Sequence, residues 1–410
     1  MMPPSRILIS IIGHLAEAPR PQKEAAALVR AGHQVMIRGA WWSERLAAED
    51  MELAKSIGAD FAPLVDVRKG SKTALISRIK RRLAVELYQK FGWVTPRSFG
   101  NSGPEIVAEA KRLRPDLVII HSEDGLWAGK RLIERGFRVG VDFEDWFSED
   151  LLPEARKGRP VAALAALENY LLKHAVYCQA TTQVMAQAMA KDAGVERIPA
   201  AIPNVFPWNE RADMLQYERD ERGDEVSFYW YSQTIGPGRG LEALGKSLEK
   251  IEGHWRLRLR GTLRAGNKWL DETFPPSIRD RVEILAPVAN KYLLARHQSH
   301  DVGLALEIPY CRSRNLTATN KIFDYLRAGL AVVATDTAGQ REVMVDCPDA
   351  GWLVSAGDVD ALAKALQEAV DAPRNLANCK QAALAAAKDR WSWEHYELTL
   401  VAMVNQALEK

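Results

Sequence analysis

The stretch 319-TNKIFDYLRAGLAVVAT-335 joins a helix to a buried strand and decides how we interpret the whole chain. Apolar residues recur at helical spacing after Thr319, a residue type that favours the N-terminal cap, until Gly329, which is typical of a helix C-terminus. The run 330-LAVVAT-335 that follows is almost entirely apolar, as in strands that are covered on both faces. We therefore expect a helix over 319–328 and then a strand of a parallel sheet.

Short apolar strands alternate with amphipathic helices along both halves of the chain, which predicts two parallel sheets covered by helices on both faces. In the first half we expect strands over 6–12, 34–39, 116–121 and 137–145, and helices over 21–32, 104–115, 127–136 and a long region near 160–193. In the second half we expect strands over 226–232, 255–261, 282–287, 301–306, 330–335 and 351–355, and helices over 240–251, 289–299, 319–328 and 390–410.

A chain of 410 residues exceeds what one hydrophobic core usually supports, so two α/β domains are expected. The segment 203–226 is charged, lacks periodicity and contains two prolines, which is typical of a linker. We predict a first domain over 1–205, a second over 225–391, and a terminal helix over 392–410 that crosses back to the first. Two parallel sheets whose strand ends face one another would enclose a central cleft for ligands.

The overall charge argues against a dedicated nucleic-acid-binding protein, because 55 Lys and Arg residues against 53 Asp and Glu residues leave a formal charge of only +2. The four cysteines lie far apart without zinc or disulfide spacing, so we interpret them as reduced thiols. We take the apolar run 6-RILISIIG-13 for a first strand rather than a signal peptide, and no run reaches the roughly 20 apolar residues of a membrane span. These features predict a cytoplasmic protein.

The start of the helix over 319–328 has the chemistry of an anion site. Free N–H groups at a helix N-terminus, beside Asn320 and the ammonium group of Lys321, favour a phosphate, and Asp324 one turn later can accept hydrogen bonds from ribose hydroxyls. The pattern is therefore that of a site for a nucleoside diphosphate. An ordinary capped helix with Lys321 and Asp324 in solvent is the alternative that spacing alone leaves open.

A glycine-rich loop, 231-YSQTIGPGRGLEAL-244, connects the first strand of the second domain to a helix. Gly238 and its neighbouring glycines allow the backbone to approach a ligand closely, and Arg239 offers a fork of donors suited to a diphosphate. The loop is neither a dinucleotide fingerprint nor a P-loop, because it contains no G-x-G-x-x-G and no G-K-[ST]. A flexible turn between strand and helix is the alternative.

These motifs resemble those of the retaining glycosyltransferases of family 4, whose GT-B fold consists of two facing Rossmann-like domains. The stretch 320–343 looks like the family's segment E-A-M-A-x-G-x-P-V-V-A-T-D-x-G-G-x-x-E, and 232–244 looks like its loop G-R-x-x-x-x-K-G-x-x-x-L. Further matches follow the same order along the chain at 116-DLVIIHSED-124, 142-DFEDWF-147, 203-PN-204 and 391-WSWE-394.

The resemblance implies roles for several residues at the donor site. Asp324 takes the place of the family's second motif glutamate, which binds the donor ribose, and Arg239 takes that of its loop lysine, which contacts the diphosphate. Gly13 matches the glycine loop near the donor phosphates. Gln233 replaces the family's loop arginine, so one charge is lost or its task has moved to Lys321.

The largest departure from the family concerns the contact with the donor sugar. Leu316 stands where the family's E-x7-E motif has its first glutamate, and Glu307 lies upstream at a different spacing. Polar neighbours such as Arg312 and Arg314 could serve instead, and an arginine there would suit a donor or acceptor that bears a carboxylate. The identity of the donor sugar is therefore open.

In the first domain, 138-RVGVDFEDWFSED-150 looks like the family's strand-end segment v-x-D-x-H-E. Glu144 or Asp145 could take a proton from an acceptor hydroxyl if partial burial raises the pKa of the carboxyl, and a solvated acidic loop is the alternative. His121 matches the second histidine of the family's H-x-H-D run and is the other catalytic candidate, with a purely structural role as its alternative.

The resemblance implies catalysis without a covalent enzyme nucleophile, a cofactor or a metal. Arg239, Lys321 and helix N-termini would hold the substrates together and stabilise the departing diphosphate, because that is where charge develops. Consistently, the sequence contains no H-E-x-x-H motif and no Cys/His set with zinc spacing.

The segment 68-RKGSKTALISRIKRRLAVELYQKFGW-93 contains eight basic residues against one acid, with apolar and aromatic residues at helical spacing. This pattern predicts a basic amphipathic helix that lies on an anionic membrane surface. A charged helix packed on the first domain is the alternative, and a nucleic-acid patch is disfavoured.

We therefore interpret the chain as an enzyme that moves a sugar from a nucleotide-sugar to a glycan or lipid-linked acceptor in cell-surface polysaccharide assembly. Two other functions stay open. A nucleotide-sugar epimerase of the same fold would not need the basic segment 68–93, and a non-catalytic sugar- or nucleotide-binding protein is suggested by the glutamate missing at Leu316.

Overall fold

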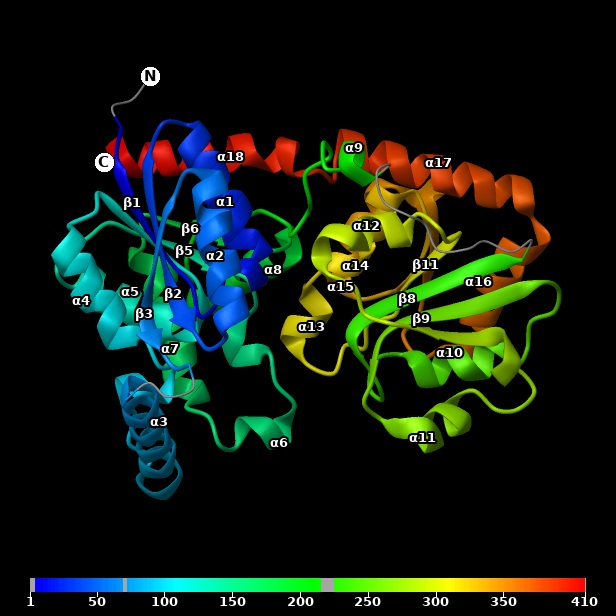
Figure 1. The fold of residues 1–410 in the computed structure, drawn as a ribbon, viewed down its shortest axis with the longest axis horizontal. Helices are drawn as coiled ribbons and strands as arrows, with labels where there is room; N and C mark the ends of the chain where they lie inside the picture. The colour runs from blue at the N-terminus through cyan, green and yellow to red at the C-terminus, as the bar shows by residue number, and fades with distance from the viewer. Residues whose placement is uncertain (1–3, 69–71, 215–224, 410) are drawn as a thin grey trace. The chain divides into compact units, whose positions relative to one another are not determined.

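The computed structural model of the chain describes residues 4–68, 72–214 and 225–409. The chain forms two compact units, Met1–Ile202 with Tyr396–Lys410, and Pro203–His395 (Figure 1). The second unit thus begins at Pro203, within the segment expected to be a linker, because residues 203–210 bond to helices of that unit. Residues 215–224 of the expected linker and Lys69 of the basic segment lie outside the described residues.

The sheet of the first unit is parallel throughout, with the strand order β3-β2-β1-β4-β5-β6-β7. Its strands are β1 Arg6–Ser10, β2 Gln34–Trp41, β3 Asp60–Asp66, β4 Leu117–Ile120, β5 Val139–Phe143, β6 Tyr177–Ala180 and β7 Ala200–Ala201. Its helices are α1 Pro19–Arg30, α2 Glu44–Ile57, α3 Lys72–Phe91, α4 Gly103–Leu113, α5 Ser122–Ile133, α6 Pro153–Arg156, α7 Val161–His174 and α8 Gln183–Ala193, with the short 3-10 helices η1 Leu15–Glu17, η2 Pro96–Ser98 and η3 Phe147–Glu149.

The prediction of one long helical region near 160–193 is wrong, because the buried strand β6 separates α7 from α8. Helix-forming Ala, Leu and Met residues dominate both flanks and hide four strand residues whose side chains are all buried. Tyr177 and Cys178 pair with β5 in the interior of the sheet. A strand this short carries too few positions for its own period to stand out.

The last helix, α18 (Trp393–Glu409), belongs to the first unit from Tyr396 onward. Arg30 pairs with Glu397 at 2.8 Å, and Nε2 of His33 lies 3.0 Å from Oδ1 of Asn405. The predicted return of the terminal helix to the first domain is therefore confirmed.

The sheet of the second unit is also parallel, with the order β10-β9-β8-β11-β12-β13. Its strands are β8 Val226–Ile235, β9 Trp255–Leu263, β10 Val282–Leu285, β11 Val302–Ala305, β12 Ala331–Thr335 and β13 Gly351–Val354. Its helices are α9 Arg211–Met214, α10 Leu241–Leu248, α11 Gly266–Thr273, α12 Asn290–His297, α13 Arg312–Leu316, α14 Asn320–Ala328, α15 Ala338–Asp346, α16 Val359–Asp371 and α17 Pro373–Asp389, with η4 Arg279–Arg281 and η5 Pro348–Ala350.

In each unit the strand order reverses direction at one place, between β1 and β4 in the first and between β8 and β11 in the second. Ligands of doubly wound sheets bind outside the carboxyl ends of the strands at such a switch point. The loops after these four strands hold Gly13, His121, Arg239 and Glu307, respectively. The topology therefore places these four residues where ligands of such sheets bind.

Close packing holds α14 over the second sheet. The ring of Tyr325 lies on β11 at Gly303, where an added Cβ would come within 2.2 Å of the ring. Tyr325 is fully buried, so a larger residue at Gly303 would push α14 away from the strand. The start of α14 is thus fixed relative to the end of β11. None of the described helices is long and apolar enough to cross a membrane.

Candidate functional site

The loop after β8 presents Arg239 at the carboxyl edge of the second sheet. Gly238 and Gly240 adopt φ angles of 74° and 79°, which favour glycine, and they turn the loop so that Arg239 is exposed. The Arg239 guanidinium donates to Ser232 Oγ at 2.9 Å and to Thr234 Oγ1 at 3.2 Å. Hydroxyl groups orient a guanidinium without neutralising it, so this edge carries a positive charge suited to a phosphate.

Lys321 lies in the first turn of α14, and its ammonium group pairs with Oε1 of Glu307 at 2.7 Å. The hydroxyl of Thr319, the N-cap residue, donates to the same oxygen at 3.2 Å and makes no capping bond to its own helix. Burial would raise the pKa of the Glu307 carboxyl, but the charge and hydrogen bond of Lys321 outweigh burial and hold that pKa below its usual value. An ionised carboxylate therefore occupies the position that an incoming anion would take at this helix end.

Asp324 lies inside the second unit and is only 4% exposed. Its Oδ2 accepts from the Tyr231 hydroxyl at 2.5 Å, and its Oδ1 accepts from Arg327 at 3.0 Å. Burial raises the pKa of the Asp324 carboxyl, although Arg327 and Tyr231 oppose the rise. The alternative in which Lys321 and Asp324 are solvated is wrong, because Asp324 is buried and Lys321 is paired with Glu307.

Asn320, the third predicted residue of this helix end, accepts a hydrogen bond through Oδ1 from the Asn204 side chain at 2.7 Å. Arg327 pairs with Glu210 at 2.5 Å, so the segment 203–210 is fastened to α14 at two points. Residues 204 and 210 thereby restrain the helix that carries Lys321.

His121 is the first residue after β4 and lies between two carboxylates. Its Nδ1 is 2.8 Å from Glu144 Oε1, and its Nε2 is 2.8 Å from Glu24 Oε2. Because both acceptors are carboxylate oxygens, both ring nitrogens must carry protons, and the ring is an imidazolium. Burial lowers the pKa of His121, but Glu144 and Glu24 outweigh burial and raise it well above 6.5. His121 therefore favours its charged form, and both of its ring nitrogens are already bonded to carboxylates.

Glu144 is partly exposed at the end of β5, with 34% of its side-chain surface accessible. Burial raises its pKa, but the hydrogen bond and charge of His121 more than compensate and lower the pKa below 4.5. The condition set for Glu144 as a base, a pKa raised by partial burial, is therefore not met, because the charge of His121 outweighs burial. The structure does bring two of the predicted residues, His121 and Glu144, into direct contact.

Two residues of this network, Arg20 and Glu24, were missed by sequence reasoning. Arg20 makes two bonds to Asp142, of 2.5 Å and 2.9 Å, and a third to the carbonyl of Ile202 at 2.7 Å. Arg20 and Glu24 are four positions apart on α1 and share a face with Leu28, which is fully buried. Two charges on the apolar face of an amphipathic helix are the signal that could have found them.

The roles predicted for Gly13, Gln233 and Asp145 stay predictions. Gly13 follows β1, and the indole of Trp42 fills the space where a Cβ would lie, at a distance of 2.0 Å. Gln233 is exposed at the irregularity in β8. Asp145 is half-buried in the bend after β5, next to Glu144.

A metal ion could in principle be held by His121, Asp142 and Glu144, whose ligand atoms lie within 4.8 Å of one another. The donors are of the right type, but Asp142 is engaged by Arg20 through both oxygens and both nitrogens of His121 face carboxylates. A cation would have to displace the Arg20 guanidinium and deprotonate the imidazolium. The set fits an internal ion network better than a metal site.

Comparison with known families gives a match over residues 233–372 to the family described as Glycosyl transferases group 1. This range contains Arg239, Glu307 and Lys321, so the part of the chain that carries them matches the group 1 family. The prediction of a glycosyltransferase is confirmed at this level. No curated protein matches the chain in sequence.

Solved structures share the fold over the full length. Sucrose-phosphate synthase from Thermosynechococcus elongatus has a TM-score of 0.68 at 15% identity and covers 99% of both chains. Anabaena Alr3699/HepE in complex with UDP has a TM-score of 0.66 at 15% identity and covers 98% of this chain and 99% of its own. A UDP-N-acetylglucosamine 2-epimerase described as putative, from Listeria monocytogenes, has a TM-score of 0.57 at 12% identity. The match covers 100% of this chain and 97% of the epimerase chain. The predicted GT-B fold of two Rossmann-like units is confirmed.

Proposed function

We propose that this enzyme moves a sugar, with retention of configuration, from a nucleotide-diphosphate sugar to a glycan or lipid-linked acceptor. The observation that carries the proposal is the pair of cations, Arg239 and Lys321, at the carboxyl ends of the two strands that flank the switch point of the group 1 domain. The likeness to HepE, whose structures hold UDP or UDP-glucose, supports a nucleotide-sugar as the donor.

The second unit would bind the donor through its diphosphate. Negative charge develops on the diphosphate as the glycosidic bond breaks, and Arg239 and Lys321 would stabilise that charge without a metal. Lys321 reaches the diphosphate only when it exchanges Glu307 for a phosphate oxygen. The ordered hydroxyls of Ser232 and Thr234 hold Arg239 ready for the same contact.

The first unit would bind the acceptor beside Glu144. The carboxylate is ionised and partly exposed, so it can accept a hydrogen bond from the attacking hydroxyl and orient that hydroxyl toward the donor. The imidazolium of His121 holds the carboxylate in place, and Glu24 and Asp142 in turn hold His121. We assign His121 to positioning, with Asp145 as a further candidate for acceptor contact.

The exposed surface of helix α3 supports the proposal that the acceptor lies in a membrane. The helix extends from the body of the first unit (Figure 1) and packs on η2 and β3, with Ala74 and Ala84 buried. Val85, Leu87 and Tyr88 are partly buried, whereas six further apolar side chains are 49–63% exposed and alternate with exposed basic residues; they are Leu75, Ile76, Ile79 and Leu83, with Phe91 and Trp93 at the helix end. We propose that this face rests on an anionic bilayer at the cytoplasmic side, where lipid-linked precursors of surface polysaccharides are assembled.

The epimerase remains the second candidate, because a 2-epimerase shares the fold. The glycosyltransferase proposal is preferred because the family match concerns glycosyl transfer and because the epimerase structure is less similar, at a TM-score of 0.57 against 0.68. An epimerase also has no use for the exposed face of α3.

The experiment is incubation of the enzyme with UDP-glucose, UDP-N-acetylglucosamine or GDP-mannose, with and without a lipid extract of bacterial membranes. A transferase releases nucleoside diphosphate in a manner that depends on the extract. Conversion of the donor into an isomeric nucleotide-sugar, with no diphosphate release, would establish the epimerase instead. If the nucleotide binds but neither reaction takes place, the result favours a non-catalytic binding protein.

A further inference from the structure

Glu168 of α7 is a buried acid to which the proposed mechanism assigns no part. Only 1% of its surface is exposed. A buried carboxyl is costly unless hydrogen bonds satisfy it, and an apolar side chain would fill the same space without that cost. The partners of Glu168 therefore indicate what the residue does.

These partners lie on a single turn, the 3-10 helix η3 with the residue before it. Oε1 of Glu168 accepts from the backbone N–H of Ser148 at 3.1 Å, and Oε2 accepts from the Ser148 hydroxyl at 2.5 Å. The Trp146 side chain also donates a hydrogen bond to this carboxyl. N–H groups in the first turn of a helix lack partners within the helix, and the N-cap residue of η3 supplies none. Glu168 therefore caps η3 from a neighbouring helix.

The capped turn directly follows the residues that we assigned to the acceptor. Strand β5 ends at Phe143, and Glu144 and Asp145 come between this strand and Trp146. The sheet fixes the start of this short span, and Glu168 fixes its end. The direction in which Glu144 and Asp145 point thus depends on both anchors.

A second tie holds η3 on its outer side. Arg156 pairs with Glu149 at 3.4 Å, with 30% and 28% of the two side chains exposed. A long, solvent-accessible ion pair contributes little to stability. Loss of the Glu168 carboxyl would therefore remove the main polar anchor of the turn.

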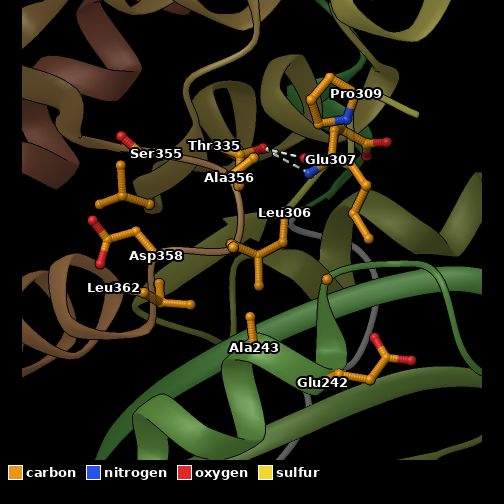
Figure 2. A pocket seen from close by; sticks show the side chains of 14 residues that line it. Glu242, Ala243, Leu306, Glu307, Pro309, Thr335, Ser355, Ala356, Asp358 and Leu362 are labelled. Atoms are coloured by element: carbon orange, nitrogen blue, oxygen red, sulfur yellow. Dashed lines mark hydrogen bonds between the residues drawn. The ribbon is translucent and has the colours of Figure 1, made fainter. Parts of the chain in front are cut away.

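The second unit holds its own strand-end carboxylate in a comparable way. The Thr335 hydroxyl on β12 accepts from the Glu307 N–H at 2.8 Å and donates to the Glu307 carbonyl at 2.8 Å, as the dashed lines of Figure 2 show. In both units a side chain of a neighbouring element fixes the backbone beside a carboxylate at the carboxyl edge of the sheet.

We propose that Glu168 is a positioning residue for the acceptor: it holds the turn after β5 so that Glu144 and Asp145 meet the acceptor in one fixed arrangement. The inference rests on the proposed function and adds to it a residue that touches neither substrate. Such an anchor matters because transfer requires the acceptor hydroxyl to be held in a narrow range of orientations.

The test compares transfer kinetics of Glu168→Leu and the wild type, with the nucleotide-sugar that the wild type accepts and a lipid extract of bacterial membranes as the source of acceptor. We expect the apparent KM for the extract to rise about fivefold or more in Glu168→Leu, because the N–H and hydroxyl of Ser148 lose their buried partner. Calorimetry should show wild-type binding of the nucleoside diphosphate. An unchanged KM in active Glu168→Leu would overturn the inference and leave the proposed function intact.

Further variants separate positioning from loss of the fold. Glu168→Gln keeps the size and one acceptor oxygen and should restore a KM close to that of the wild type. Ser148→Ala removes one of the two Ser148 bonds and should raise KM in the same direction, so the test does not depend on the folding of one variant.

Leu400→Ala opens a cavity at a buried leucine of α18 in the same unit and serves as a destabilised control. Loss of folded enzyme lowers the maximal rate and leaves KM unchanged. A rise in KM in Leu400→Ala that equals the rise in Glu168→Leu would contradict a positioning role.

Hydrogen exchange tests the anchor itself without an acceptor. The backbone N–H of Ser148 should exchange faster in Glu168→Leu than in the wild type, whereas the amides of β5 should exchange as before. Unchanged exchange at Ser148 would overturn the inference. If the wild type transfers no sugar from any donor, the proposed function fails and the inference falls with it.

Discussion

The ammonium group of Lys321 lies 2.7 Å from a carboxylate oxygen of Glu307, so the cation at the start of α14 is already paired before any donor arrives. The pair orients the Lys321 side chain at a half-buried helix end, with 15% of the lysine and 18% of the glutamate side chain exposed. A phosphate that binds Lys321 must therefore displace the Glu307 carboxylate from the ammonium group, rather than a water molecule.

Glu307 and Lys321 should affect UDP binding in opposite directions. Lys321→Met removes the cation and should weaken binding by about tenfold or more, because a hydrogen bond to a charged group contributes about 1.5–3 kcal/mol. Glu307→Gln removes the competing charge and should tighten binding of UDP alone severalfold. Calorimetric titration of the two variants checks both, and a change in the same direction for both would contradict the competition.

Asp324 should prove to be a stability residue as well as a candidate for ribose contact. Asp324→Ala leaves Arg327 and the Tyr231 hydroxyl without their buried partner, so we expect the free energy of unfolding to fall by about 3 kcal/mol. Asp324→Asn keeps the shape and one acceptor and should cost less. Urea denaturation measures both. Wild-type stability of Asp324→Ala, with nucleotide binding lost, would instead assign the residue to the ligand alone.

Glu168 should make stability depend on pH. Burial raises the pKa of this carboxyl on α7 to about 7, although hydrogen bonds from Ser148 oppose the rise. Because the folded pKa exceeds the ordinary value of 4.5, its favourable contribution is complete below about pH 4.5 and is lost as the pH rises to about 7.

The expected loss is about 3 kcal/mol, since each pKa unit corresponds to about 1.4 kcal/mol. Urea denaturation between pH 5 and pH 8 should show the wild type losing stability relative to Glu168→Gln, which keeps the size of the side chain and does not titrate. A difference between the two proteins that stays constant with pH would show that Glu168 has an ordinary pKa.

The exposed face of α3 should bind anionic vesicles. Ile79→Glu and Leu83→Glu each place a negative charge on this face and should strongly reduce sedimentation with phosphatidylglycerol vesicles, which high salt should also weaken. Leu398→Glu, at an exposed leucine of α18, is the control and should behave as the wild type. Equal sedimentation of all three variants, or binding to neutral vesicles alone, would assign α3 another partner.

Much of the fold could be predicted from the sequence because local signals suffice for it. Gly329 marks the end of α14, and continuous apolar runs mark the buried strands β11 and β12. Strand β6 was missed because four strand residues cannot outweigh long helix-forming flanks, and β3, with Pro63 in its middle, gave no alternating pattern.

The site was predictable only in part, because spacing identifies residues but not their distant partners. His121 and Glu144 were found at strand ends, whereas Glu24 lies 97 positions from His121 and reaches it only through the fold. A raised pKa was the condition for Glu144 as a base, and the sequence could not reveal that contact with His121 lowers this pKa instead. The same limit applies to Glu307, whose link to Lys321 spans a loop and a short helix.

The most direct test of the central claim is calorimetric titration of the wild type and Arg239→Ala with UDP, GDP, ADP and dTDP, with Arg374→Ala, at an exposed arginine of α17, as the control. The account predicts saturable binding of at least one nucleoside diphosphate by the wild type and the control, weakened about tenfold or more in Arg239→Ala. Absence of binding by the wild type, or binding unaffected by Arg239→Ala, would contradict a donor site at this edge of the second sheet.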